Sequence, residues 1–283
     1  MGLWSSIKKA AKKVARVVKA VVRTVVKVVV EVVSRVLNSV AQLVLFWKEK
    51  RMRMVVIILR DETGIPLINE NDKNLLTAIA YAKKTFKDRM NINLEAYGTL
   101  VQTLPDPAPT AALDVSCDSN ARGTGIAAAG AIAGGIIGVL GGPIGIGIGI
   151  AVGFGIGSAL SGKISGGALN NEFSEAGEYF AKHTAGWGWL RMSLYYPITV
   201  FIVRNITGKI GCSLGPLTDY VTLSVNGVAS NSTMAHELGH CCGLLHRENE
   251  MDNLMYPSKT RTNNKITGWQ KNVVRTSRHC TFW

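Results

Sequence analysis

The chain has 283 residues and a mass of 30.4 kDa, enough for one large domain or two small ones. Residues 1–53 hold 13 Lys and Arg against Glu31 and Glu49, a net charge of +11 out of +13 for the whole chain. The basicity therefore belongs to an N-terminal appendage, with anionic lipid or nucleic acid as expected partner, and residues 54–283 are close to neutral.

Residues 3–47 predict one long amphipathic helix, because charged residues recur every three or four positions and valine fills the opposite face. The charged positions are Lys8, Lys9, Lys12, Lys13, Arg16, Lys19, Arg23, Lys27, Glu31 and Arg35. With the early Trp4, this pattern favours an anionic membrane interface as partner. A protein partner, such as a delivery machine, is the second interpretation. Nucleic acid is unlikely, because the basic helix lacks interleaved aromatic residues.

The same N-terminus contains no ordinary signal peptide, because Lys or Arg interrupts the apolar residues too often for a continuous hydrophobic segment. We expect a secreted or injected, membrane-associated protein that uses a non-standard export route, with cytosolic residence as the alternative.

Five cysteines, an odd number without a C-x-x-C pair, argue against a structural zinc cluster. They are Cys117, Cys212, Cys241, Cys242 and Cys280. One or two disulfides are expected if the protein leaves the cytosol. We predict that Cys280 pairs with Cys241 or Cys242.

After the basic helix, residues 54–60 predict a buried strand, residues 71–89 a helix and residues 92–101 a second strand. Two strands joined by a helix form a parallel crossover unit. Residues 105–121, which contain three prolines, predict a loop.

Residues 118–168 form a glycine-rich hydrophobic insertion, with no charged residue between Arg122 and Lys163 and glycine spaced by four. Gly-Gly-Pro at 141–143 divides it into two arms of membrane-spanning length. Small residues at this spacing let helices approach closely, as in a glycine zipper, so we predict a membrane-inserting helical hairpin over residues 123–162. A packed soluble element and a disordered segment remain open alternatives.

The remaining pattern predicts a helix over residues 172–183, strands over residues 198–203 and 220–225, and a loop over residues 212–215. A short helix follows around residues 269–278. His183 and His279 are expected to be ordinary surface or helix-end histidines.

The strongest signal is the segment Met234-Ala-His-Glu-Leu-Gly-His-Cys-Cys-Gly-Leu-Leu-His246. His236 and His240 stand at i and i+4, so on a helix their rings project from one face toward a single metal ion. Gly243 can end the helix in a left-handed conformation, and the chain then returns His246 as third ligand. Three histidines leave a fourth position open, which is typical of a catalytic zinc site.

The pattern H-E-x-x-H-x-x-G-x-x-H, followed by Asn253-Leu-Met-Tyr-Pro257, resembles the metzincin metallopeptidases and their matrixin-type Met-turn. This resemblance implies Zn²⁺ bound by His236, His240 and His246, with Glu237 as general base. It implies that Met255 forms an apolar floor beneath the metal and that Tyr256 and Pro257 line the substrate pocket. The strand over residues 220–225 is a candidate edge for substrate pairing. Arg247 departs from the residues usual after the third histidine.

The combined prediction is a mixed α+β and α/β fold: a metzincin-like domain over residues 54–283, an N-terminal basic helix over residues 1–53 and the glycine-rich insertion. We expect a zinc metalloendopeptidase acting on protein or peptide substrates, deployed as a membrane-active toxin or effector. The rival interpretation is a pore-forming or membrane-disrupting protein whose zinc site is regulatory or vestigial.

Overall fold

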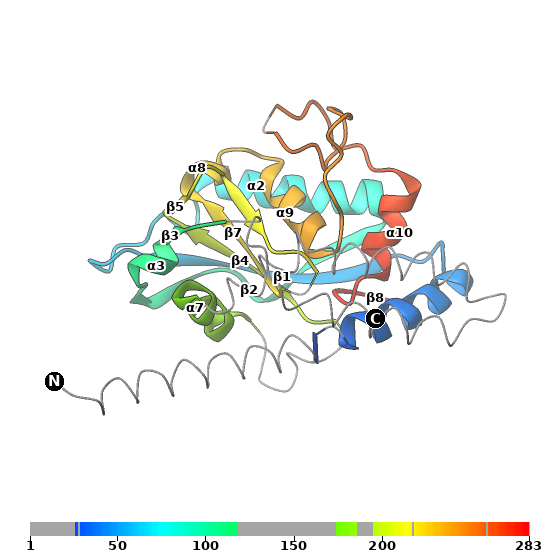
Figure 1. The fold of residues 1–283 in the computed structure, drawn as a ribbon, viewed down its shortest axis with the longest axis horizontal. Helices are drawn as coiled ribbons and strands as arrows, with labels where there is room; N and C mark the ends of the chain where they lie inside the picture. Colours follow the sequence, from blue (N-terminus) through cyan, green and yellow to red (C-terminus); the bar gives the residue numbers. More distant parts are fainter. Residues whose placement is uncertain are drawn as a thin grey trace, which may run out of the picture.

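The computed structural model describes residues 26–27, 29–117, 174–185, 195–216, 218–258 and 260–282. The predicted glycine-rich hairpin and residues 1–25 lie outside these ranges. Within them, a twisted sheet lies between helices on its two faces (Figure 1). The predicted mixed α/β class is confirmed. No helix in the described part of the chain is long and apolar enough to cross a bilayer.

The predicted crossover unit is confirmed. It consists of β1 (Lys50–Arg60), α2 (Lys73–Thr85) with a π-helical turn (Phe86–Met90), and β2 (Ile92–Pro107). The two strands pair in parallel. Helix α2 begins after Asp72, whose side chain accepts a hydrogen bond from the backbone N–H of Leu75 at 2.9 Å.

The sheet continues from β1 to β4 (Ile198–Val203) and β7 (Tyr220–Ser224), all parallel, and ends at the antiparallel strand β6 (Gly211–Ser213). The prediction that residues 220–225 form the edge is therefore wrong, because β7 lies between β4 and β6. The loop predicted over residues 212–215 overlaps β6. Gly-Cys-Ser has little strand propensity, so its pairing with β7 is imposed by tertiary structure.

Alternate side chains of β1 enter two separate cores. Met52, Met54, Val56 and Ile58 pack with α2 and α9 (Thr233–Cys241) on one face. Val55, Ile57 and Leu59 pack with α3 (Thr110–Leu113) and α7 (Glu175–His183) on the other. A strand buried on both faces reads as a continuous apolar run, as residues 54–59 do.

Short elements complete the described structure. They are β3 (Asp114–Val115), β5 (Asn205–Ile206), α8 (Val225–Val228), α10 (Gly268–Thr276) and β8 (Cys280–Thr281). Thr267 and Gln270 form a capping box that begins α10. Strand β8 pairs antiparallel with the first residues of β1, which brings the end of the chain beside its N-terminal part.

The disulfide joins Cys117 to Cys212 and so links the segment after β3 to the edge strand β6. The predicted pairing of Cys280 with Cys241 or Cys242 is wrong, because these three cysteines are buried thiols. The thiol of Cys242 lies 3.6 Å from the sulfur of Met52. Cys241 is directed elsewhere, donating to the carbonyl of Thr218 at 3.1 Å.

We expect three reactive thiols per chain when the oxidised protein is denatured without reductant, namely Cys241, Cys242 and Cys280. Reduction should expose five and lower stability by about 2–5 kcal/mol, since the cross-link restricts the unfolded chain. Thiol titration and urea unfolding measure both effects. Finding one thiol in the oxidised protein would show that a second disulfide forms.

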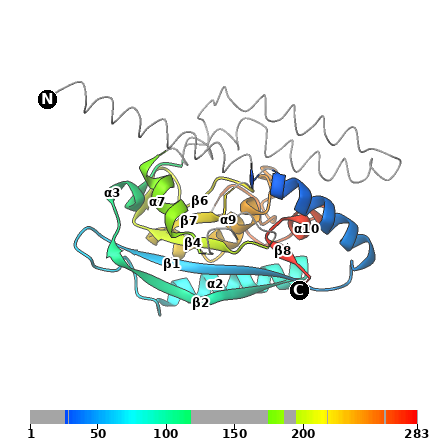
Figure 2. The ribbon, with the colours of Figure 1, turned by 90° about the horizontal axis from the view of Figure 1, so that it is seen from below.

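Residues 29–44 are helical, as predicted, and lie along α10 and β8 (Figure 2). Their orientation reverses the usual arrangement of an amphipathic helix. The buried residues are the polar ones: Glu31, Ser34, Arg35 and Asn38. Val29 and Val33 are directed outward, so polar contacts attach this helix to the domain.

Arg35 donates to the carbonyls of Val273 at 3.0 Å and Cys242 at 2.9 Å, and it pairs with Glu31 at 2.6 Å. Asn38 donates to the carbonyl of Ser277 at 3.1 Å. These bonds use backbone acceptors on α10 and at the end of α9. Whether residues 1–53 are a separate domain stays a prediction, but the described part of this helix packs on the domain that follows.

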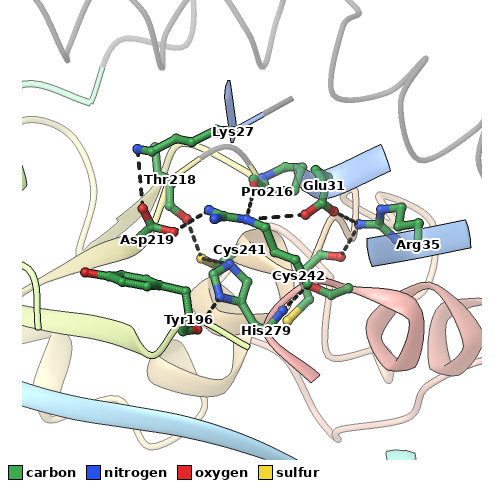
Figure 3. A network of polar contacts seen from close by, with 12 residues as sticks. Lys27, Glu31, Arg35, Tyr196, Pro216, Thr218, Asp219, Cys241, Cys242 and His279 are labelled. Atoms are coloured by element: carbon green, nitrogen blue, oxygen red, sulfur yellow. Dashed lines mark hydrogen bonds and ion pairs between the residues drawn. The ribbon is translucent and has the colours of Figure 1, made fainter. Parts of the chain in front are cut away.

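Glu31 also approaches Arg278 at 3.4 Å, and Arg278 pairs with Asp219, which in turn lies 3.4 Å from Lys27 (Figure 3). Burial opposes the charge on Asp219, but Arg278 and Lys27 lower the pKa of its carboxyl. His279 is buried in the same network, contrary to the expectation of a surface or helix-end position. Burial and Arg278 lower its pKa to about 3, so its ring is neutral.

Candidate metal centre

Helix α9 presents His236 and His240 one turn apart, and His246 returns to them after the helix ends. The Nε2 atom of His240 lies 3.1 Å from that of His236 and 3.0 Å from that of His246. One ligand atom from each ring lies within 4.8 Å of the others. Three nitrogens at such spacing can share one metal ion, because zinc–imidazole bonds are about 2.0–2.1 Å long.

The return of His246 depends on the end of α9. Gly243 has a φ of 99°, in the left-handed region, and the N–H of Leu244 donates to the carbonyl of Gly239 at 3.0 Å. A side chain at Gly243 would also meet the guanidinium of Arg35, because a Cβ there would lie 2.7 Å from Nη2. The N-terminal helix therefore contacts the turn that joins two of the histidines.

Backbone carbonyls orient two of the rings. The Nδ1 atom of His236 lies 2.8 Å from the carbonyl oxygen of Leu254, and that of His240 lies 2.7 Å from the carbonyl oxygen of Leu244. A carbonyl can only accept, so each Nδ1 carries the proton and each Nε2 keeps its lone pair. Burial lowers the pKa of both rings, that of His240 to about 3. Both are thus in the neutral form that binds metals.

Glu237 follows His236 on α9 and is buried. Burial raises the pKa of its carboxyl to about 7, although Arg261, Lys209 and a backbone hydrogen bond from Ser213 oppose the shift. Edge strand β6 passes so close that a Cβ on Gly211 would lie 2.7 Å from Oε1 of Glu237. A carboxylate with a pKa near neutrality can exchange protons at neutral pH.

Met255 packs against α9, and its predicted role as an apolar floor beneath the metal stays a prediction. Met255 is fully buried, and its sulfur lies 2.9 Å from the position of a Cβ on Gly239, so a larger residue there would collide with it. Tyr256 is half-buried and Pro257 exposed. Both lie in the same turn, but their predicted pocket role stays a prediction.

Sequence reasoning missed two contributors to this region. Arg261 donates to the carbonyl of Tyr256 at 2.7 Å and to Oγ of Ser232 at 3.1 Å, with Nη1 3.0 Å from Nδ1 of His236. The second contributor is β6, whose Gly211 and Ser213 approach Glu237. A single arginine in a polar loop and a three-residue strand carry no recognisable sequence signal.

No protein-family model and no curated protein sequence matches the chain. Among solved structures it is similar to metalloproteinase-II from Bacteroides fragilis, with a TM-score of 0.43 and 12% sequence identity. The likeness covers 82% of this chain and 53% of that chain, so this chain spans about half the length of that protein. A likeness this distant does not define a function, which has to be inferred from the chemistry of the site.

Proposed function

We propose that the chain is a zinc-dependent endopeptidase of the metzincin type. The observation that carries this proposal is the convergence of three Nε2 atoms, one of them on the residue that precedes the buried Glu237. Three protein ligands leave a position for a reactant, whereas structural zinc sites have four. His236, His240 and His246 would hold the ion. When bound, zinc acts as a Lewis acid and makes water a better nucleophile at neutral pH.

Glu237 would act as the general base, a role supported by its burial and by its pKa near neutrality. It takes a proton from the attacking water and delivers it to the amine nitrogen as the peptide C–N bond breaks. The carbonyls of Leu244 and Leu254 hold two of the imidazoles in the tautomer that leaves Nε2 free. Burial of the carboxyl keeps its pKa close to neutrality, so it can accept and return the proton.

An extended peptide substrate is expected to pair with β6. Among the described residues this strand pairs with β7 alone, so its outer edge offers backbone hydrogen-bonding groups for strand addition. Gly211 brings that edge against Glu237. A chain bound there would lie beside the histidines, which supports cleavage of internal bonds in unfolded segments.

The purified chain should cleave an unfolded protein at internal bonds and lose this activity with 1,10-phenanthroline. Restoring zinc should restore cleavage, and elemental analysis should give about one zinc per active chain. A serine-protease inhibitor is the matched control and should leave the rate unchanged. Activity that persists in the metal-free protein would contradict the proposal.

The toxin or effector role, and the rival pore-forming role, depend largely on residues 1–25 and 118–173. These residues lie outside the described ranges, so both roles stay predictions. The peptidase proposal does not depend on either.

A further inference from the structure

The outward face of residues 29–47 is a continuous apolar surface, which we call the valine face. It contains eight of the thirteen large hydrophobic residues that are exposed in the described chain. They are Val29, Val33, Leu37, Val40, Leu43, Val44, Phe46 and Trp47, with exposed fractions of 45–71%. Scattered exposed apolar residues are ordinary, but a contiguous apolar patch marks a contact surface.

The valine face carries no charge. Glu31 and Arg35 are the only charged residues between positions 29 and 47, and both are buried against the domain. Glu49, just beyond the face, pairs with Lys87. The helix therefore turns its polar side to the domain and its uncharged apolar side outward. A surface helix usually has the opposite orientation, with its apolar side against the core.

Two exposed aromatic residues lie at the C-terminal end of the valine face, and hydrogen bonds from the domain fix the backbone that carries them. The rings of Phe46 and Trp47 meet edge to face at 4.9 Å, and each is about two-thirds exposed. The carbonyl of Trp47 accepts from Asn91 at 3.1 Å, and that of Lys48 accepts from Arg275 at 2.8 Å. Exposed aromatic rings on a fixed backbone suit a boundary between apolar and aqueous phases.

The charge of the neighbouring sequence indicates what covers this surface. Residues 1–25 contain seven Lys and Arg and no acidic residue. Pairing two copies of the chain through the valine face would bring two such segments together, which like charges oppose. An anionic lipid surface accepts the apolar side chains and attracts the cations at the same time.

We propose that the valine face docks the protein onto anionic lipid bilayers, with the helix in the plane of the interface and the rest of the domain above it. The helix is thus attached to the domain by Glu31, Arg35 and Asn38 and to the membrane by its opposite side. This proposal concerns binding and does not depend on the proposed peptidase activity.

The test is co-sedimentation of the full chain with vesicles of phosphatidylcholine alone or with about one-third phosphatidylglycerol. The wild type should bind the anionic vesicles more strongly, and salt should weaken that binding. Leu43→Glu/Trp47→Glu should lower the partition coefficient by about tenfold or more. Ile65→Glu/Leu76→Glu adds the same two charges at exposed apolar positions outside the valine face. This matched control should stay within about twofold of the wild type.

A second measurement uses Trp47→Phe and vesicles that contain brominated lipid. Replacing Trp47 should reduce the vesicle-dependent fluorescence quenching if this ring enters the bilayer. The proposal is overturned if the wild type does not bind anionic vesicles, or if the two double variants bind alike. It is also overturned if Leu43→Glu/Trp47→Glu splits a dimer in sedimentation velocity while vesicle binding is unchanged, because a second copy would then be the occupant.

Discussion

Glu237→Ala should reduce kcat/KM for peptide cleavage by about 10²–10⁴, the range of general acid–base contributions, while the protein still binds one zinc. Glu237 is not one of the expected metal ligands, because the three histidines alone can hold the ion. Removing its carboxylate should therefore eliminate proton transfer and leave the metal in place. Steady-state kinetics with elemental analysis of the same samples measure both quantities.

Two further variants are needed beside Glu237→Ala, one that should lose the metal and one that should leave the kinetics unchanged. His240→Ala should lose both metal and activity, because the central nitrogen of the cluster is removed. Glu175→Ala removes an exposed carboxylate from α7, which packs on the opposite face of the sheet from α9, and should retain wild-type kinetics. If Glu237→Ala cleaves at the wild-type rate, Glu237 is not the base and the proposed mechanism is wrong.

Arg35→Met should lower the free energy of unfolding by about 3–5 kcal/mol, which is large against the roughly 5–15 kcal/mol that stabilises a typical domain. Arg35 is buried and pairs with Glu31, and it satisfies the carbonyls of Cys242 and Val273. The substitution keeps much of the volume but leaves these acceptors without their donor. Urea unfolding of the zinc-free and zinc-bound protein measures the loss.

The matched control for Arg35→Met is Arg204→Met. Arg204 also bonds two carboxylates, those of Glu62 and Asp114, but these groups lie at the surface, where water replaces the lost contacts. Its substitution should change stability little. Similar small changes in both variants would show that the contacts of residues 29–44 do not hold the domain together.

The sequence located the candidate metal site because its information is local. Two histidines one turn apart on a helix, followed by a glycine that ends it, bring three rings together without any distant contact. The crossover unit of β1, α2 and β2 was predictable for a similar reason. The periodicity of apolar residues and capping residues such as Asp72 can be recognised within one short segment of the sequence.

The features that could not be predicted depend on partners far along the chain. Strand β6 exists because β7 and Cys117 hold it, since Gly211–Ser213 alone does not favour a strand. The orientation of the N-terminal helix is the clearest example. The valine pattern predicted an amphipathic helix but not how it attaches to the domain. Arg35 finds its acceptors more than 200 residues away, and the helix docks by its polar side. Amphipathicity alone does not show which face meets the protein.

We propose that this chain hydrolyses internal peptide bonds at the site of His236, His240, His246 and Glu237. The most direct measurement is mass spectrometry of the products formed from an unfolded protein in heavy-oxygen water. We predict internal fragments with heavy oxygen in each new terminal carboxyl group, present with the zinc-loaded wild type and lost with Glu237→Ala. No internal fragments from the zinc-loaded wild type, or equal fragments from Glu237→Ala, would contradict this claim.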